Sequence, residues 1–272
     1  MLRHIIFTTK KKPPMLDKLK EQCMQKGVRL YFTFPNEITL LAETLYITDT
    51  AEIFNGLREE FANVLVWLHA DNRDEDFSMV SYVVEDIEEA DYTYFEKVYL
   101  RFRGQPWTVA ETKRCTIREM TEEDLEEIYF IYQGKNITKY MEDLYEDPEE
   151  ERQFIRAYIK NAYEYYGYGT WVICSKENNR LIGRVGFNLR EGFEEPELGF
   201  VIGEEYQRQG YAKECCEAVI QLGKEEYEFE QIQTLVKEDN LASLMLCEKL
   251  GFTFAEKVLW EKEEYLRYLK KL

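Results

Sequence analysis

The run from Gln207 to Ala212, Gln-Arg-Gln-Gly-Tyr-Ala, has residue types that let main-chain amides bind an anion. It follows an alternating, strand-like stretch, Glu197–Ile202, and leads into a helical stretch, Lys213–Glu226. The first turn of a helix carries unpaired N–H groups and the positive end of the helix dipole, so it binds phosphate without basic side chains. Gly210 permits close approach of the backbone, and Ala212 keeps the neighbouring position small. The sequence therefore predicts a phosphate-binding turn between a strand and a helix.

A second block lies downstream, where Asn240 is followed by Ser243 and by a helix that ends in Leu-Gly-Phe at residue 252. The two blocks, in this order and spacing, resemble motifs A and B of the GNAT family of N-acetyltransferases, and the resemblance covers roughly residues 114–272. It implies that the turn holds the pyrophosphate of acetyl-coenzyme A and that no metal is required.

The resemblance also implies where the rest of the cofactor lies. In the expected fold, the strand Glu197–Ile202 splays from the strand Gln231–Val236, and the pantetheine amides fill the gap as a pseudo-strand, because unpaired strand edges need partners. Arg208 either adds charge or is a solvated surface residue, and Asn240 and Ser243 either contact the cofactor or cap a helix. The implied cofactor-binding residues are Val201, Ile202, Gln207, Arg208, Gln209, Gly210, Tyr211, Ala212, Asn240 and Ser243.

Acyl transfer to an amine needs a polarised thioester carbonyl, a neutral amine and a proton for the leaving thiolate. A backbone N–H near Val201 is the candidate for the first task. Glu197 is the candidate base, directly or through water, and the alternative is a strand-edge charge. The family commonly uses a tyrosine of motif B as the acid, and Cys247 stands at that position here. We keep Glu197 and Cys247 as catalytic candidates, although buried cysteines are more often small apolar side chains.

Composition limits the partners. The net charge of −18 argues against nucleic acid and favours a cationic acceptor, unless it serves solubility alone. No segment reaches the ~20 apolar residues that cross a membrane, and no signal peptide opens the chain. The six cysteines form no Cys-x-x-Cys, so we expect no zinc site and a reduced, cytoplasmic location.

We expect an acetyl-CoA-dependent N-acetyltransferase that acts on a primary amine of a small molecule or a protein N-terminus, with a homodimer left open. The alternative is a coenzyme A-binding sensor or regulatory protein whose catalysis has lapsed, which the cysteine at residue 247 favours. A phosphatase run by the N-terminal region is the third class that we consider.

Two domains are predicted, at residues 1–110 and 111–272. The first alternates strands and helices, which indicates a small Rossmann-like α/β domain with a mainly parallel sheet. It loosely resembles a reduced haloacid-dehalogenase-like domain at Ile47–Thr50 and Val84–Asp86, but the stretch Ile5–Thr9 lacks the aspartate nucleophile of that family. Asp49 or Thr50 is expected to cap the following helix, and for Asp49 the alternative is a metal ligand. The second domain is predicted to be an α+β acetyltransferase fold with a splayed, mixed central sheet.

Overall fold

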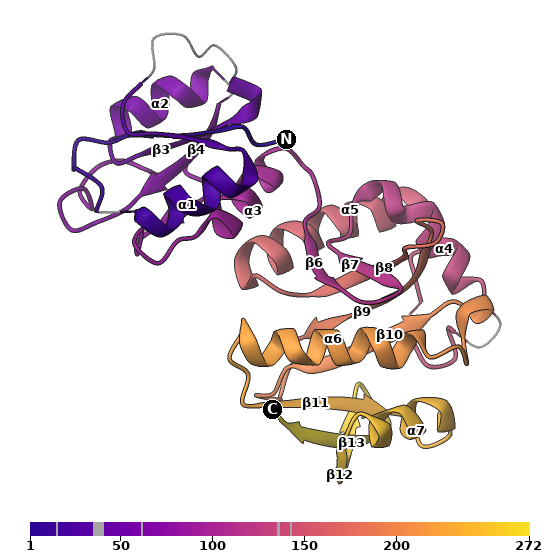
Figure 1. Ribbon diagram of the computed structural model, residues 1–272. Helices are drawn as coiled ribbons and strands as arrows, with labels where there is room; N and C mark the ends of the chain where they lie inside the picture. Colours follow the sequence, from indigo (N-terminus) through magenta and orange to yellow (C-terminus); the bar gives the residue numbers. More distant parts are fainter. Residues whose placement is uncertain (15, 35–40, 61, 135–136, 142) are drawn as a thin grey trace. The chain divides into compact units, whose positions relative to one another are not determined.

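The computed structural model describes residues 1–272 except 15, 35–40, 61, 135–136 and 142. The chain divides into two compact units, Met1–Gln105 and Pro106–Leu272 (Figure 1). The boundary predicted at residue 110 falls inside β6 (Thr108–Glu111), which pairs with β7 of the second unit. Among the described residues, no helix combines the length and the apolar character that crossing a bilayer requires.

The first unit is a five-stranded sheet in the order β2-β1-β3-β4-β5, with every neighbouring pair parallel, as predicted. Alternate residues of the central strands face opposite sides. Ile5 and Phe7 pack with α1 and α3, whereas Ile6 packs with α2, so helices cover both faces. The elements are β1 (His4–Thr8), α1 (Asp17–Lys26), β2 (Arg29–Tyr31), η1 (Leu41–Glu43), β3 (Thr44–Thr48), α2 (Ala51–Glu59), β4 (Asn63–Trp67), β5 (Val83–Val84) and α3 (Tyr92–Phe102).

The prediction that Asp49 caps α2 is wrong. Its buried carboxylate accepts the backbone N–H groups of Lys10 and Lys11, both at 2.8 Å, and so joins the loops that follow β3 and β1. The N–H of Ala51 at the start of α2 donates instead to the Glu75 carboxylate. A carboxylate 24 residues away therefore accepts the first N–H of the helix, and the local sequence around Asp49 gives no sign of this contact.

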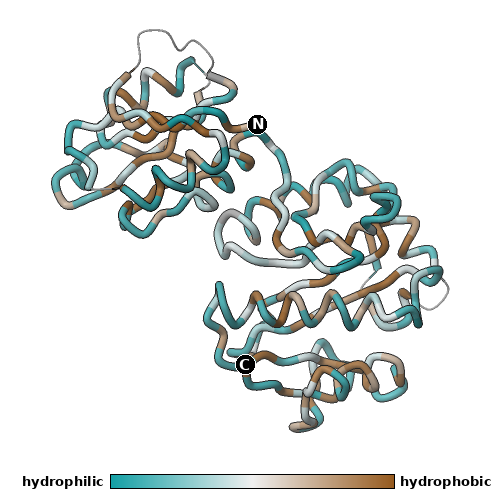
Figure 2. Tube along the Cα trace, in the orientation of Figure 1, coloured by the Kyte–Doolittle hydropathy of each residue, from teal (hydrophilic) through white to brown (hydrophobic). Residues whose placement is uncertain are grey.

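The second unit is built on one mixed sheet of eight strands in the order β12-β13-β11-β10-β9-β8-β7-β6. In Figure 2 the central strands are hydrophobic along most of their length, and the connecting loops are mostly hydrophilic. The strands are β6 (Thr108–Glu111), β7 (Cys115–Arg118), β8 (Thr170–Ser175), β9 (Leu181–Asn188), β10 (Glu197–Ile202), β11 (Gln231–Val236), β12 (Thr253–Trp260) and β13 (Glu263–Lys271). The helical segments are η2 (Glu122–Asp124), α4 (Leu125–Tyr132), α5 (Pro148–Tyr158), the π-helical η3 (Ile159–Tyr166), η4 (Glu204–Tyr206), α6 (Tyr211–Glu225) and α7 (Leu241–Lys249).

Local sequence signals fix several boundaries of this unit. Thr121 and Asp124 form the predicted capping box before α4, and Pro148 occupies the first position of α5. Gly167 ends the π-helical segment in the left-handed conformation. A side chain at Gly183 would lie 2.3 Å from the carbonyl oxygen of Val201, which explains the glycine within β9.

The predicted splay of β10 from β11 is present. The two parallel strands are in register at a single pair, Glu197 and Gln233. The fully buried Gln233 side chain accepts from Arg267 Nε at 2.8 Å and donates to the Glu195 carbonyl at 2.9 Å, and the same arginine pairs with the Glu195 carboxylate at 2.6 Å. This polar network holds the strands together at one end. Beyond it, toward Ile202, β10 is hydrogen-bonded to β9 and parts from β11.

Candidate functional site

The turn between β10 and α6 leaves the first turn of the helix open. Gly210 is the N-cap residue, with φ of 86°, and no side chain caps α6. Gln207 and Gln209 turn their side chains back, and their amides donate to the carbonyls of Ile202 at 2.9 Å and Glu205 at 2.7 Å. These contacts fold the turn while leaving the helix N–H groups available to an anion.

Arg114, which the sequence analysis did not single out, clamps this turn from the start of β7. Its guanidinium donates to the carbonyl of Gln209 at 3.0 Å, pairs with Glu214 at 2.7 Å and lies 4.0 Å from the centroid of the Tyr211 ring. Burial alone would raise the pKa of the Glu214 carboxyl, but hydrogen bonds from Thr112 and Arg114 together lower it. The predicted Arg208 is exposed and adopts a left-handed φ of 58°. Arg114 and Gln209 are 95 residues apart, so the sequence around the turn does not indicate their contact.

The backbone of β10 offers hydrogen-bonding groups to the gap. The N–H of Gly203 donates to β9, and the carbonyl of Pro196 accepts from β11. Because backbone groups alternate along an extended strand, those of Phe200 and Ile202 point toward β11 and those of Val201 point toward β9. This differs from the sequence prediction for Val201, and it adds Phe200 to the residues that face the gap.

Glu197 lies at the closed end of the gap, beside Gln233 in register. Its carboxylate is 8% exposed and pairs with Arg190. The Arg190 guanidinium also lies 4.4 Å from the centroid of the Trp260 ring. The pairing stabilises the ionised carboxylate and occupies a lone pair that a base would use, so Glu197 is masked in this arrangement.

Cys247 is a core side chain. It is 1% exposed on α7, and burial raises the pKa of its thiol to about 12, although a contact with Thr234 opposes the shift. A buried thiol with this pKa is poorly placed to exchange protons with a ligand. All six cysteines are buried and unlinked, and the described residues contain no group of three or more histidine, cysteine or acidic side chains that could hold a metal.

Asn240 caps α7, since its side-chain oxygen accepts the N–H of Ser243 at 3.2 Å. This is the alternative role that the sequence analysis left open, and it leaves the amide nitrogen of Asn240 for other contacts. The neighbouring Asp239 pairs with Lys139 at 2.8 Å, and its carbonyl accepts the hydroxyl of Tyr140 at 3.1 Å. The connection between α4 and α5 is thereby held against the segment that follows β11.

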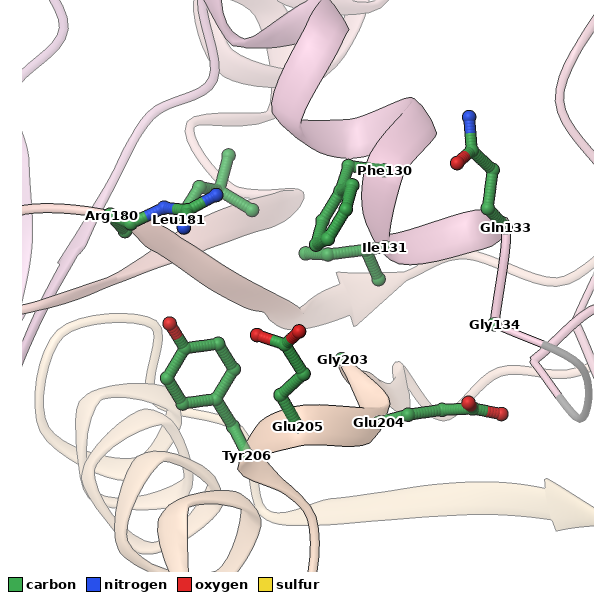
Figure 3. Close-up of a pocket in the computed structure, with 10 residues that line it drawn as sticks. All are labelled: Phe130, Ile131, Gln133, Gly134, Arg180, Leu181, Gly203, Glu204, Glu205 and Tyr206. Carbon is green, nitrogen blue, oxygen red and sulfur yellow. The ribbon is translucent and has the colours of Figure 1, made fainter.

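A hollow of about 200 Å³ lies before the turn (Figure 3). Figure 3 shows Glu205 and Tyr206 pointing toward the end of α4 and the start of β9, while the Glu204 side chain points away from those of Glu205 and Tyr206. A side chain at Gly134 would lie 2.9 Å from Glu204 Cγ, so α4 and the segment before the turn approach closely. The hollow is lined by Phe130, Ile131, Gln133, Gly134, Arg180, Leu181, Gly203, Glu204, Glu205 and Tyr206. Its two carboxylates make it a poor site for a diphosphate.

Comparison with known proteins adds independent findings. A family model described as "Acetyltransferase (GNAT) domain" matches residues 114–253, just over half of the chain. An uncharacterised N-acetyltransferase of Bacillus subtilis, YoaA, is 30% identical over 147 residues, which cover 53% of this chain and 82% of YoaA.

Solved structures share the fold. RimL, a ribosomal L7/L12 alpha-N-protein acetyltransferase, superposes with a TM-score of 0.54 at 15% identity, covering 62% of this chain and 96% of RimL. The microcin C7 self-immunity acetyltransferase MccE, solved with acetyl-CoA and AMP, has a TM-score of 0.51 at 17% identity. The match covers 60% of this chain and 94% of MccE. With motif, fold and family match in agreement, the chain belongs to the GNAT family of acetyltransferases.

Proposed function

We propose that this protein transfers the acetyl group of acetyl-coenzyme A to a primary amine of a small molecule or a protein N-terminus. The observation that carries the proposal is the uncapped start of α6 directly beyond the point where β10 and β11 part. An anion-binding helix start and a neighbouring strand gap match the two chemically distinct parts of coenzyme A, its diphosphate and its amide-bearing arm.

The N–H groups of Gln209 to Ala212 are assigned to the diphosphate, with Arg114 holding the turn in place. The backbone groups of Phe200 and the N–H of Ile202 are assigned to the pantetheine amides, because the Ile202 carbonyl already accepts from Gln207. Coenzyme A brings the activated acetyl group as a thioester. The amide nitrogen of Asn240 and the hydroxyl of Ser243 remain assigned to the cofactor side of α7.

Glu197 is assigned as the base that accepts the proton of the attacking amine, once Arg190 has left it. Cys247 is not assigned the acid role, because burial separates its thiol from ligand and raises its pKa to about 12. Loss of an acid of this kind lowers the rate of a transfer reaction without abolishing it.

The proposal is tested by mixing the protein with acetyl-CoA and a panel of primary amines, and by following free thiol with a disulfide reagent. We expect amine-dependent thiol release in the wild type and at least about a hundredfold loss in Glu197→Gln. Calorimetry with coenzyme A provides the control for an intact cofactor site. Tight coenzyme A binding without turnover on any amine would support the sensor alternative instead.

A further inference from the structure

Three of the protein's own cations lie over aromatic faces in the second unit, each from a segment that flanks or belongs to β10, β11 or β13. Arg190 lies over Trp260 at 4.4 Å, Arg267 over Phe193 at 4.9 Å and Lys237 over Tyr265 at 5.8 Å. Arg267 and Lys237 have acidic partners that anchor them elsewhere, at 2.6 Å and 2.7 Å. Arg190 is different, because its acidic partner is Glu197, the candidate base.

The Arg190 guanidinium therefore occupies a subsite made of a carboxylate and an aromatic face. Such a pair is a general recognition element for a cation, which gains both an ion pair and a cation–π contact. The Glu197 side chain is 8% exposed and the Arg190 side chain 26% exposed, so the arginine is the outer member of the pair. Removing it would leave a buried carboxylate without that charge partner, which favours entry of another cation.

The surroundings of this subsite are acidic. Arg190 lies in the connection between β9 and β10, which carries the exposed Glu191 and Glu194. Trp260 ends β12; the exposed Glu261 and Lys262 follow it, and the exposed Glu264 lies at the start of β13. Carboxylates in excess around a site attract cations and disfavour an acceptor that carries its own carboxylate or phosphate.

We infer that Arg190 is a stand-in for the substrate: the acceptor is an amine with at least two positive charges, and its ammonium displaces Arg190 from Glu197 and Trp260. This inference rests on the proposed function. On displacement, Glu197 takes a proton from the bound ammonium. The resulting neutral amine forms the C–N bond as the thioester C–S bond breaks. The nitrogen then gives its second proton to solvent, and the leaving thiolate takes a proton from solvent.

The test uses two acceptors of equal chain length, 1,4-diaminobutane and 4-aminobutanoate, which differ in the charge of the second end. Binding of each is measured by calorimetry in the presence of coenzyme A, and acetyl transfer is measured separately. We expect the diamine to bind at least about tenfold more tightly than the amino acid. The Arg190→Met variant should bind the diamine about fivefold more tightly than wild type, since the competing guanidinium is gone, and Trp260→Ala should bind it more weakly.

Arg156→Met is the matched control, because Arg156 on α5 makes a partly exposed ion pair with Glu122 of η2. It should leave diamine binding and transfer unchanged. Arg190→Lys, which keeps the charge and loses the planar guanidinium, serves if the methionine variant melts early. Equal binding of the two acceptors, or weaker diamine binding by both folded Arg190 variants, would overturn the inference. Diamine binding as expected without acetyl transfer would refute the proposed function and leave the cation subsite standing.

Discussion

Replacing Gly210 by alanine should weaken coenzyme A binding by more than its effect on folding explains. Gly210 adopts φ of 86° at the start of α6, and a Cβ there would lie 3.5 Å from Arg114 Nη2, an ordinary contact. The protein itself therefore has room for the methyl group. The left-handed conformation costs an L-residue roughly 1–2 kcal/mol. For a unit of this size, each kcal/mol lost lowers Tm by about 2–4 °C.

The added methyl group also stands where the diphosphate must approach the main chain. We expect coenzyme A to bind at least about tenfold more weakly, a loss of about 1.4 kcal/mol, as measured by calorimetry. Gly167→Ala is the matched control, since Gly167 has φ of 78° with open space around a Cβ. It should lower Tm by a similar amount and leave the affinity for coenzyme A unchanged.

Gly210→Asn separates the two effects further, because asparagine tolerates the left-handed conformation better than alanine does. It should recover part of the stability and none of the affinity. If Gly210→Ala lost stability like Gly167→Ala and still bound coenzyme A as tightly as wild type, main-chain recognition at this turn would be refuted.

Three further predictions follow from named contacts. Arg114→Gln removes the clamp on Gln209 and Glu214, so coenzyme A should bind about fivefold more weakly in calorimetry, and unchanged affinity would show that the turn holds its shape alone. Arg267→Met removes the donor to the side-chain oxygen of the fully buried Gln233 and the charge partner of the Glu195 carboxylate. Urea unfolding should therefore show a loss of about 2–4 kcal/mol, and a loss below about 0.5 kcal/mol would argue against a joint at this end of the gap. Because burial raises the pKa of Cys247 to about 12, iodoacetamide at pH 8 should leave this thiol unmodified in the native protein. Cys247→Ala should retain acetyl transfer within about threefold. Rapid labelling of Cys247, or a folded Cys247→Ala variant without activity, would support a catalytic role for this cysteine.

The elements of the second unit were largely predictable because their signals are local. The alternation in Glu197–Ile202, the proline at residue 148 and the glycines at 167 and 210 each act within a few residues. The splay of β10 from β11 was also expected, on the resemblance to the acetyltransferase family.

Contacts between distant segments were not predictable in the same way. Arg114 reaches the turn across 95 residues, and Glu75 takes the helix start that was assigned to Asp49. The contact of Arg190 with Trp260 depends on how two hairpins meet, and the backbone direction at Val201 depends on the pairing partner. Sequence spacing fixes none of these, because each is decided by packing between elements.

Hydrogen–deuterium exchange with and without coenzyme A tests the central claim most directly, because it reports on the main-chain amides themselves. The account predicts that amides of Gln209 to Ala212 exchange more slowly when coenzyme A is bound, while those of the capped α7 start at Ser243 change less. Saturating coenzyme A binding that leaves the exchange of the Gln209–Ala212 amides unchanged would contradict it.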